Sequence, residues 1–374
     1  MHAPDDAALV AGISAWAAVE SPTHDAAGVN RAMDLVAAEA AATAIAVERV
    51  PGRDGLGDSL VLRAGPGRQD PGILLLSHLD TVHPVGTLGR DLPIRVEGDR
   101  LYGPGVYDMK GGAWLAFQAF LAVAKAGSAR LPLAFLFTPD EEIGSPTTRG
   151  LIEDLGRGAA YALVTEPGRD GGKVVTARKG VGRFTIEVEG RPSHAGTRHQ
   201  DGRSAIDEAA RQIGAINALT DYARGVTTNV GVIAGGTADN VVAQHCRFSV
   251  DLRVVTAADG DLYADKILGL KPAGEGVRVT VSGGMNRPPY ERSPETARLY
   301  EQARDLAAEL GFELGEVPQT GGGSDGNFTA ALGVPTLDGL GIDGDGAHTL
   351  AEYGLISSVR PRIALMAALL SRLG

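Results

Sequence analysis

Two neighbouring stretches decide the fold of this 374-residue chain: GILLLSHLDTV at residues 72–82 and LYGPGVYDMKGG at residues 101–112. The first begins with a continuous apolar run, residues 72–77, which is typical of a strand buried on both faces of a parallel sheet. His78 and Asp80 follow at the end of this strand. Because residues i and i+2 of an extended strand point the same way, we expect Asp80 to orient the imidazole of His78. This makes His78 a candidate metal ligand.

The second stretch places Asp108 between a glycine-rich turn and a segment with helical periodicity. An acidic group at this junction lies near the positive end of a helix dipole, which favours the ionised carboxylate that a cation needs. Taken singly, both residues also have an ordinary structural interpretation. His78 would be a hydrogen-bonded core histidine, and Asp108 an N-terminal helix residue.

Length, charge and cysteine content narrow the class of protein. A chain of 374 residues is long enough for two domains, and its single cysteine, Cys246, excludes both a disulfide framework and a cysteine-based zinc site. Any metal must therefore be held by His, Asp and Glu. The formal net charge of -11 argues against nucleic acid or an anionic membrane as a partner. Because we find no signal peptide and no membrane-spanning apolar run, we expect a cytoplasmic protein.

Strands and helices alternate along the first half of the chain, which predicts an α/β fold with a mostly parallel sheet flanked by helices. Two further apolar runs, residues 131–138 and 161–165, have the character of buried strands. The other predicted elements are helices at 5–19 and 27–42, strands at 44–50 and 58–64, and a hairpin formed by 92–96 and 100–102.

Acidic side chains follow these buried strands at their C-terminal ends. Glu141 and Glu142 come after residues 131–138, and Glu166 comes after residues 161–165. Ligands of open α/β sheets bind at this edge. The sequence therefore gathers several carboxylates and an imidazole at one place.

The character of the strands changes near Gly180. Residues 183–189 alternate apolar and polar side chains, as in a sheet with one face in solvent. The following order of elements, β-α-β-β-α-β, is the ferredoxin-like plan. We therefore expect an inserted α+β domain at 180–288, with residues 1–179 and 289–374 forming the first domain. The other predicted elements of the inserted domain are helices at 204–219 and 262–268 and strands at 229–233, 246–254 and 277–282.

Five side chains are candidate metal ligands: His78, Asp108, Glu142, Glu166 and His348. Two imidazoles and three carboxylates suit a pair of divalent ions in which one carboxylate bridges and each ion also binds one His and one further carboxylate. Two Zn²⁺ ions with a bridging hydroxide would balance the charge, and such a pair activates water for attack. Glu141 then remains as general base, passing the proton of the attacking water to the leaving amine.

Six motifs resemble, in order and spacing, the dinuclear zinc amidohydrolases that include carboxypeptidase G (glutamate carboxypeptidase), acetylornithine deacetylase and succinyl-diaminopimelate desuccinylase. The resemblance covers nearly the whole chain and is closest to the carboxypeptidase G branch. The motifs are SHLDTV (77–82), GPGVYDMKGG (103–112), TPDEEIGS (138–145), VTEP (164–167), RPSHAG (191–196) and AHTLAEYG (347–354).

The resemblance implies a zinc-exopeptidase-like catalytic domain with two Zn²⁺ per subunit, for which Co²⁺ or Mn²⁺ could substitute. It also implies a homodimer formed through the inserted dimerisation or lid domain. Asp108 would bridge the metals and precede a cis peptide bond to Met109. His78 and Glu166 would bind one ion, and Glu142 and His348 would bind the other.

The resemblance also assigns roles around the metals. Glu141 would be the base and Asp80 the partner of His78, while His194 would donate a hydrogen bond to the oxyanion in the active site of the other subunit. The substrate carboxylate would be bound by Asn240, Arg253 and Arg287, with the backbone of Gly322 or Gly323 lining the pocket.

Several residues keep alternative interpretations. Arg253 and Arg287 either bind substrate or are ordinary solvated charges, and Lys179 either approaches the substrate or marks the domain boundary. His83 is expected to be a surface residue. A nucleotide loop at residues 321–323 is disfavoured because no Lys-Ser/Thr pair follows.

The leading functional hypothesis is a zinc-dependent hydrolase that releases an amino acid, such as C-terminal glutamate, from an N-acyl or peptidyl substrate. A rival with the same chemistry is a deacylase of another amino acid, of the acetylornithine or succinyl-diaminopimelate type. A rival of a different class is a non-catalytic metal-binding or amino-acid-binding protein. The presence of Glu141 disfavours the last.

Overall fold

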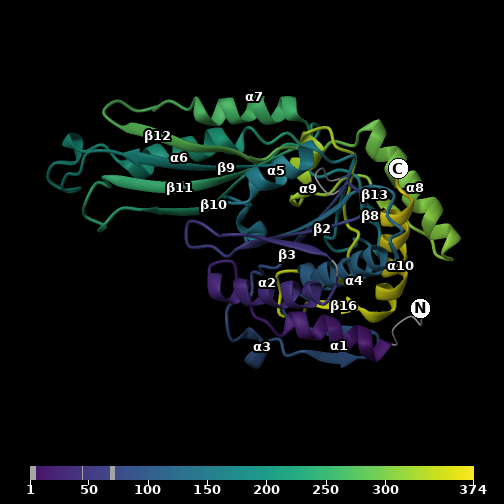
Figure 1. Ribbon diagram of the computed structural model, residues 1–374. Coiled ribbons are helices and arrows are strands. Elements are labelled where there is room, and N and C mark those ends of the chain that lie inside the picture. Colours follow the sequence, from purple (N-terminus) through teal and green to yellow (C-terminus); the bar gives the residue numbers. More distant parts are fainter. Residues whose placement is uncertain (1–5, 44, 68–71) are drawn as a thin grey trace. The chain divides into compact units, whose positions relative to one another are not determined.

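The computed structural model describes residues 6–43, 45–67 and 72–374, which divide into two compact units (Figure 1). The first unit comprises the described residues of 1–177 together with 292–320 and 324–374, and the second comprises 178–291 with 321–323. The second unit thus extends two residues before and three residues after the segment 180–288 that we expected to be inserted. Its additional short segment, residues 321–323, is distant in sequence and was not anticipated.

The first unit is built on a six-stranded mixed sheet with the order β1-β2-β6-β3-β7-β14. Strand β3 runs parallel to β6 and β7, and β7 runs parallel to β14, whereas β1 and β2 are antiparallel additions at one edge. The predicted α/β fold is therefore confirmed, with the antiparallel pair making the sheet mixed. The strands are β1 (Ala46–Val50), β2 (Ser59–Ala64), β3 (Ile73–His78), β6 (Leu133–Thr138), β7 (Tyr161–Val164) and β14 (Thr336–Leu337).

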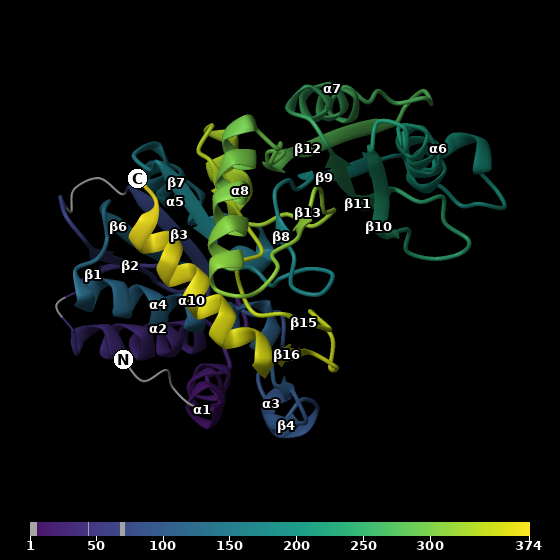
Figure 2. The same cartoon turned by 90° about the vertical axis from the view of Figure 1, so that its right-hand side faces the viewer.

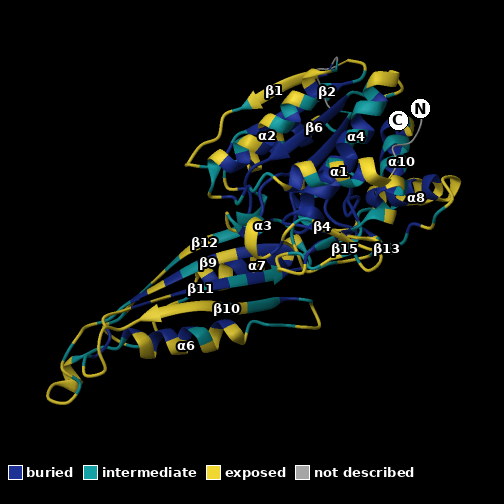
Figure 3. Cartoon of the chain, turned by 90° about the horizontal axis from the view of Figure 1, so that it is seen from below, coloured by how far each residue is buried: buried dark blue, intermediate teal, exposed yellow. Residues whose placement is uncertain are grey.

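Helices cover both faces of this sheet, so every residue of β3 and β6 is buried. Leu75 packs into the larger core cluster, while its neighbours Leu74 and Leu76 pack into the smaller one on the opposite face. Figure 3 shows β6 in dark blue inside the unit, and Figure 2 shows α8 beside α10. The helices are α1 (Asp6–Ala17), α2 (Ala26–Ala41), α4 (Gly111–Ala126), α5 (Arg149–Arg157), α8 (Pro294–Glu309), α9 (Gly326–Ala331) and α10 (Ile356–Arg372).

A smaller four-stranded sheet in the first unit has the order β15-β16-β5-β4. It contains the predicted hairpin, β4 (Arg95–Glu97) with β5 (Arg100–Tyr102), which is confirmed. Two late strands, β15 (Gly344–Asp345) and β16 (Tyr353–Leu355), complete it by antiparallel pairing. This sheet joins the end of the chain to the segment before Asp108. The described residues of this unit also form α3 (Thr87–Arg90), β8 (Val174–Val175) and β13 (Glu316–Val317).

The second unit has the predicted β-α-β-β-α-β order. Its four strands form an antiparallel sheet in the order β10-β11-β9-β12, and its two helices pack against one face of that sheet. Side chains on this face, such as Phe184 and Phe248, are buried, while Glu187 and Arg247 on the other face are exposed. The elements are β9 (Gly180–Glu189), α6 (Ala205–Asn217), β10 (Thr227–Gly235), β11 (His245–Val254), α7 (Ala257–Leu268) and β12 (Arg278–Arg287).

Two elements of this unit are longer than the sequence pattern indicated. Strand β12 continues to Arg287, whereas the predicted strand stopped at Ser282, because the alternation is interrupted by Gly283 and Gly284 with φ of 113° and 158°. Helix α7 begins five residues earlier than expected, after the N-cap Thr256, whose hydroxyl accepts a hydrogen bond from the Asp259 N–H. Among the described residues, no helix combines the length and apolar character that a membrane span requires.

Candidate metal centre

Three strands of the large sheet deliver acidic and imidazole side chains to the same edge. His78 is the last residue of β3, Glu166 follows β7 by two positions, and the short helical turn Glu141–Ile143 follows β6. Because β3 lies between β6 and β7 in parallel register, these side chains emerge together. The expected placement of His78, Glu141, Glu142 and Glu166 therefore matches the fold.

The smaller sheet supplies the remaining two candidates. Asp108 lies between β5 and α4, in a turn that includes the cis peptide bond between Asp108 and Met109. His348 lies in the turn between β15 and β16 and has a left-handed backbone conformation, with φ of 64°. Since β16 pairs with β5, the two turns project from neighbouring strands.

All five candidate ligands converge. Each oxygen of Asp108 faces a different imidazole: Oδ1 lies 3.4 Å from His78 Nε2, and Oδ2 lies 3.4 Å from His348 Nε2. The Glu142 carboxylate is 3.1 Å from His348 Nε2, and the Glu166 carboxylate is 3.7 Å from His78 Nε2. The arrangement has two halves that share Asp108.

The protonation of His78 follows from its second nitrogen. Nδ1 lies 2.9 Å from the main-chain carbonyl oxygen of Asp80, which can only accept a hydrogen bond. Nδ1 therefore carries the proton in the neutral ring, and the lone pair of Nε2 points toward Asp108 and Glu166. Asp80 orients the imidazole as expected, although mainly through its carbonyl group, because its carboxylate oxygen is 3.4 Å away.

The Asp80 carboxylate has a further task that the sequence did not indicate. It accepts hydrogen bonds from the Thr23 hydroxyl at 2.7 Å and from the backbone N–H groups of Glu141 and Glu142 at 3.2 and 3.1 Å. One buried carboxylate thus fixes the turn that presents Glu141 and Glu142.

Burial and the neighbouring charges shift the pKa values of these groups in opposite directions. Burial by itself would raise the pKa of Asp108, but the neighbouring imidazoles of His348 and His78 outweigh it and lower that pKa well below its usual range. Burial raises the pKa of Glu142. Burial disfavours the charged form of His78, yet the Asp108 and Asp80 carboxylates raise its pKa well above its usual value. The pKa of the half-exposed His348 rises to about 10 because Asp108 and Glu142 accept hydrogen bonds from it.

The donor set fits divalent cations. Two triads, His78 with Asp108 and Glu142, and His78 with Glu141 and Glu166, each have ligand atoms within 4.8 Å of one another. Within the described part of the chain, Asp108 Oδ1 and Glu142 Oε1 are buried without a hydrogen-bond partner. A buried carboxylate oxygen that lacks a donor is costly unless a cation compensates it. Carboxylate oxygen and imidazole nitrogen are ligands that Zn²⁺ accepts.

Glycine is required behind the cluster. A Cβ atom on Gly112, in the first turn of α4, would lie 2.1 Å from the carbonyl oxygen of Thr165, and one on Gly341 would lie 2.2 Å from the same oxygen. The two glycines therefore allow α4 and the late loop to approach the backbone that carries Glu166.

Two functional candidates were missed. The expectation that His83 is a surface residue is wrong: it is only 6% exposed, and its Nε2 lies 2.6 Å from Glu352 Oε2. The sequence pattern did not indicate this burial because the partner of His83, Glu352, is 269 residues away in the sequence. Glu352 itself, in the AEYG segment four residues after His348, was not considered. Its carboxylate accepts hydrogen bonds from the turn that carries Asp108.

Two site candidates of the second unit, His194 and Asn240, lie on adjacent exposed turns, with the Ala195 N–H donating to the Asn240 carbonyl at 2.9 Å. The Nδ1 atom of His194 accepts hydrogen bonds from the N–H groups of Gly196 and Thr197 at 3.1 and 3.3 Å. The neutral ring therefore carries its proton on Nε2, which makes Nε2–H a hydrogen-bond donor.

The remaining candidates gather at residues 321–323. Arg253 forms a bidentate pair with Asp251, at 2.6 and 2.8 Å, and donates to the Gly321 carbonyl at 3.3 Å. Arg287 is only 3% exposed, so it is not an ordinary solvated charge, and its Cδ would be 2.8 Å from a Cβ on Gly323.

Arg178 and Lys179, at the start of the second unit, each donate a hydrogen bond to a backbone carbonyl group of that unit. Arg178, which the sequence did not single out, is buried and donates to the Gly322 carbonyl at 3.2 Å. Lys179 donates to the Gly225 carbonyl at 2.6 Å. Lys179 thus holds a turn of the second unit.

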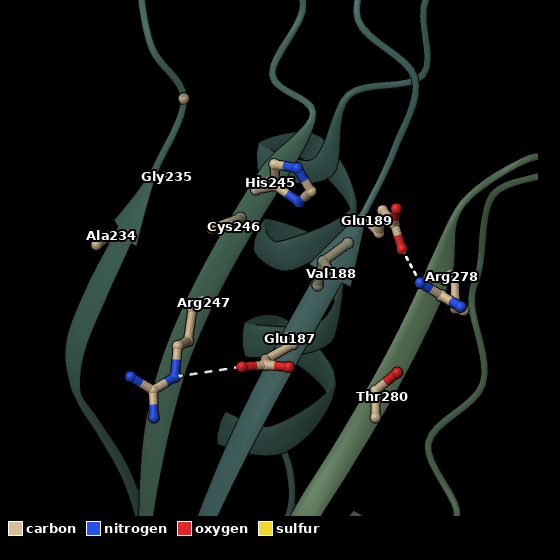
Figure 4. Close-up of a pocket in the computed structure, with 11 residues that line it drawn as sticks. Glu187, Val188, Glu189, Ala234, Gly235, His245, Cys246, Arg247, Arg278 and Thr280 are labelled. Carbon is tan, nitrogen blue, oxygen red and sulfur yellow. Dashed lines mark hydrogen bonds and ion pairs between the residues drawn. The ribbon is translucent and has the colours of Figure 1, made fainter.

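The second unit also has a groove of about 530 Å³ on the uncovered face of its sheet (Figure 4). Its charges pair across the strands: Arg247 lies 3.7 Å from Glu187, and Arg278 pairs with Glu189. None of the predicted site residues lines this groove. The groove is therefore separate from the candidate metal centre, whose five candidate ligands all belong to the first unit.

Residues 74–372 match the model of peptidase family M20/M25/M40. Carboxypeptidase G2 of Pseudomonas sp. (strain RS-16) is 31% identical over 95% of this chain and 87% of its own length. Acetylornithine deacetylase of Myxococcus xanthus is 34% identical over 52% of this chain and 53% of its own length.

The fold has relatives among solved structures. The M20 family metallo-carboxypeptidase Sso-CP2 from Sulfolobus solfataricus superposes with a TM-score of 0.75 over 99% of both chains, at 15% identity. The resemblance drawn from the six motifs is confirmed. The chain belongs to peptidase family M20/M25/M40 and is a metal-dependent peptidase or amidohydrolase of N-acyl or peptidyl amino acids.

Proposed function

We propose that this enzyme is a dinuclear zinc carboxypeptidase that releases glutamate or a similar acidic amino acid from an N-acyl or peptidyl substrate. One observation carries the dinuclear part: the two oxygens of Asp108 face the imidazoles of His78 and His348 at equal distances of 3.4 Å. A carboxylate in this position suits a bridging ligand. His78 and Glu166 would then hold one ion, and Glu142 and His348 the other.

When bound, a metal pair lowers the pKa of a water molecule and polarises the amide carbonyl. Glu141 is the general base in this proposal. It takes a proton from the attacking water and delivers it to the leaving amine. Its backbone N–H is held by Asp80, which also orients His78, so the base and one ligand share a support. His194 would donate its Nε2–H to the carbonyl oxygen of the substrate, in the active site of the partner subunit.

The preference for an acidic amino acid rests on the second unit. Arg287 is buried beside residues 321–323, and Arg253 donates to the same segment. Since Arg287 is only 3% exposed while the Arg253 side chain is 29% exposed, and water weakens charge interactions, we assign the stronger contribution to Arg287. Asn240 and the backbone of Gly322 and Gly323 complete the proposed contacts with the substrate carboxylate. The similarity to carboxypeptidase G2 over 95% of the chain supports this choice.

A second candidate, a deacylase of another amino acid, is favoured by the 34% identity to an acetylornithine deacetylase. That similarity spans only 52% of the chain, and the arginines of the second unit favour an acidic product. A non-catalytic binding protein is disfavoured because Glu141 lies within the ligand cluster. A cytoplasmic location, and Co²⁺ or Mn²⁺ as alternative metals, stay predictions.

A homodimer through the second unit is part of the proposal. Strand β10 lies at the edge of its sheet, where unpaired backbone groups are available for pairing with another chain. Its side chains Val232 and Ile233 are 66% and 53% exposed. Light scattering of the purified enzyme should give twice the subunit mass of 38.6 kDa. Val232→Lys should shift the measured mass toward that of the monomer.

The test combines metal analysis with a substrate panel. Elemental analysis should find two zinc ions per subunit in the wild type and a reduced content in Asp108→Ala. The wild type should hydrolyse N-acyl-glutamate faster than N-acetylornithine or succinyl-diaminopimelate. One weakly held ion per subunit would contradict the dinuclear centre, and no activity on acidic amino acids would contradict the substrate assignment.

A further inference from the structure

We propose that Glu352 is a positioning residue of the metal centre. Its buried carboxylate clamps the turn that carries Asp108 against the loop that carries His348, and His83 completes the clamp. This inference rests on the ligand assignment proposed above. It adds a residue that is not itself a ligand.

Glu352 makes four polar contacts with its two oxygens. Oε1 accepts hydrogen bonds from the backbone N–H groups of Tyr107 and Asp108, both at 2.9 Å. Oε2 accepts from the Gly105 N–H at 3.2 Å and lies 2.6 Å from His83 Nε2. One of these donors is therefore the backbone of the proposed bridging ligand itself.

The position of Glu352 in the chain explains why this contact matters for two ligands. Glu352 immediately precedes β16, which pairs with β5, so the two loops are joined at their base by Tyr353 opposite Tyr102. The Glu352 carboxylate joins them again near the tip of the Asp108 turn. The loop with His348 therefore has a fixed relation to Asp108 before any metal binds.

The burial of Glu352 indicates why a carboxylate, rather than an amide, occupies this place. The side chain is 1% exposed, and a buried charge is tolerated only where hydrogen-bond donors surround it. Here three backbone N–H groups and one imidazole face it. Glutamine would turn an NH₂ group toward at least one of these donors, so the clamp would open.

The consequence concerns metal affinity more than the overall fold. Partners that orient metal ligands typically change affinity or activity by about 10- to 100-fold when they are removed. A displaced Asp108 would weaken both ions, because it faces both imidazoles. Substrate contacts of the second unit would be unaffected, so kcat should fall while KM stays nearly constant.

The experiment compares Glu352→Gln with a matched control, Glu208→Gln. Glu208 belongs to the second unit, is also buried, and also accepts two backbone hydrogen bonds, from Ala273 and Gly274 at 2.7 and 3.0 Å. Both variants should lose thermal stability in the metal-free form. Only Glu352→Gln should bind Zn²⁺ about 10- to 100-fold more weakly, as measured by calorimetric titration of the metal-free protein.

Two further variants make the outcome decisive. His83→Gln keeps a hydrogen-bond donor and should retain most of the metal affinity, whereas His83→Leu should lose part of it. Wild-type Zn²⁺ affinity in Glu352→Gln, or an equal loss in Glu208→Gln, would overturn the inference.

Asp108→Asn separates this inference from the function on which it rests. If Asp108→Asn binds Zn²⁺ as the wild type does, the proposed ligand set is wrong. If Asp108→Asn loses affinity while Glu352→Gln keeps it, only the clamp is wrong. The absorption spectrum of the Co²⁺-loaded protein gives a second readout, because a shifted Asp108 should change the band positions in Glu352→Gln and leave them unchanged in Glu208→Gln.

Discussion

Charged side chains are arranged differently in the two units. At the edge of the large sheet, five carboxylates, those of Asp80, Asp108, Glu141, Glu142 and Glu166, lie around two imidazoles, and every one of these side chains except His348 is at most 11% exposed. On the open face of the second sheet, arginines and carboxylates pair one to one across neighbouring strands. The first arrangement gathers carboxylates and imidazoles in the manner of a metal site, whereas the second pairs opposite charges with each other.

The two candidate substrate arginines differ in their burial. The Arg253 side chain is 29% exposed and pairs with Asp251, while Arg287 is only 3% exposed and lies next to Gly323. An ion pair is stronger where water is excluded, because water screens charge. Burial therefore ranks the two arginines, and mutations can test that ranking.

Glu141 should give the largest effect. Because it lies in the cluster and is assigned to proton transfer, Glu141→Gln should reduce kcat by about 10²- to 10⁴-fold. The metals should stay bound, since the other carboxylates provide the ligands. Steady-state kinetics together with elemental analysis checks both expectations.

A lost metal would change the meaning of that result. If Glu141→Gln loses one ion together with its activity, Glu141 is a ligand, as its triad with His78 and Glu166 would also allow. Full turnover with both metals present would remove Glu141 from the mechanism. Glu153→Gln, a surface change on α5, should leave kcat and metal content unchanged and serves as the control.

Arg287 should give an intermediate effect, confined to acidic substrates. Removing a hydrogen bond to a charged group costs about 1.5–3 kcal/mol, so Arg287→Met should lower kcat/KM for N-acyl-glutamate by about 10- to 100-fold. Arg253→Met is the matched variant and should cost less, because the Arg253 side chain is 29% exposed and water screens its charge. Equal losses for N-acyl-glutamate and a neutral N-acyl amino acid would show that neither arginine selects the acidic group.

The candidate metal cluster could be predicted because its geometry is local to each strand. Knowing that His78 ends one parallel strand and that Glu142 and Glu166 follow its neighbours is enough to bring them to one edge. Asp108 and His348 were harder, since their proximity depends on the short pairing of β5 with β16, and only the family resemblance pointed to it. The α/β class and the β-α-β-β-α-β order could also be predicted, because the spacing of apolar residues within each segment distinguishes strands from helices.

The supporting contacts could not be predicted. His83 and Glu352 are 269 residues apart, and no periodic pattern links two single polar residues over that distance. Residues 321–323 belong to the second unit although they lie in the final third of the chain, because backbone carbonyl groups, which carry no sequence signal, accept hydrogen bonds from Arg178 and Arg253. Sequence thus indicates the candidate ligands better than the hydrogen bonds that hold them in place.

The last expectation concerns a different quantity, the dependence of metal affinity on pH. In the metal-free protein the pKa of His348 is raised to about 10 by Asp108 and Glu142, so its imidazole is protonated at neutral pH. A metal ion must displace this proton before it can bind Nε2. Each displaced proton makes the affinity rise about tenfold per pH unit below the pKa of the group, so the affinity should increase from about pH 6 to 9 and level off above about 10.

Calorimetric titration with Mn²⁺ in buffers of different ionisation enthalpy measures the released protons directly. The wild type should release at least one proton per subunit at pH 8, and His348→Ala should release about one fewer. His24→Ala, a change at an exposed histidine, should match the wild type. If His348→Ala releases as many protons as the wild type, the imidazole is not the group that the metal displaces. Asp108 and Glu142 would then hold their ion without His348.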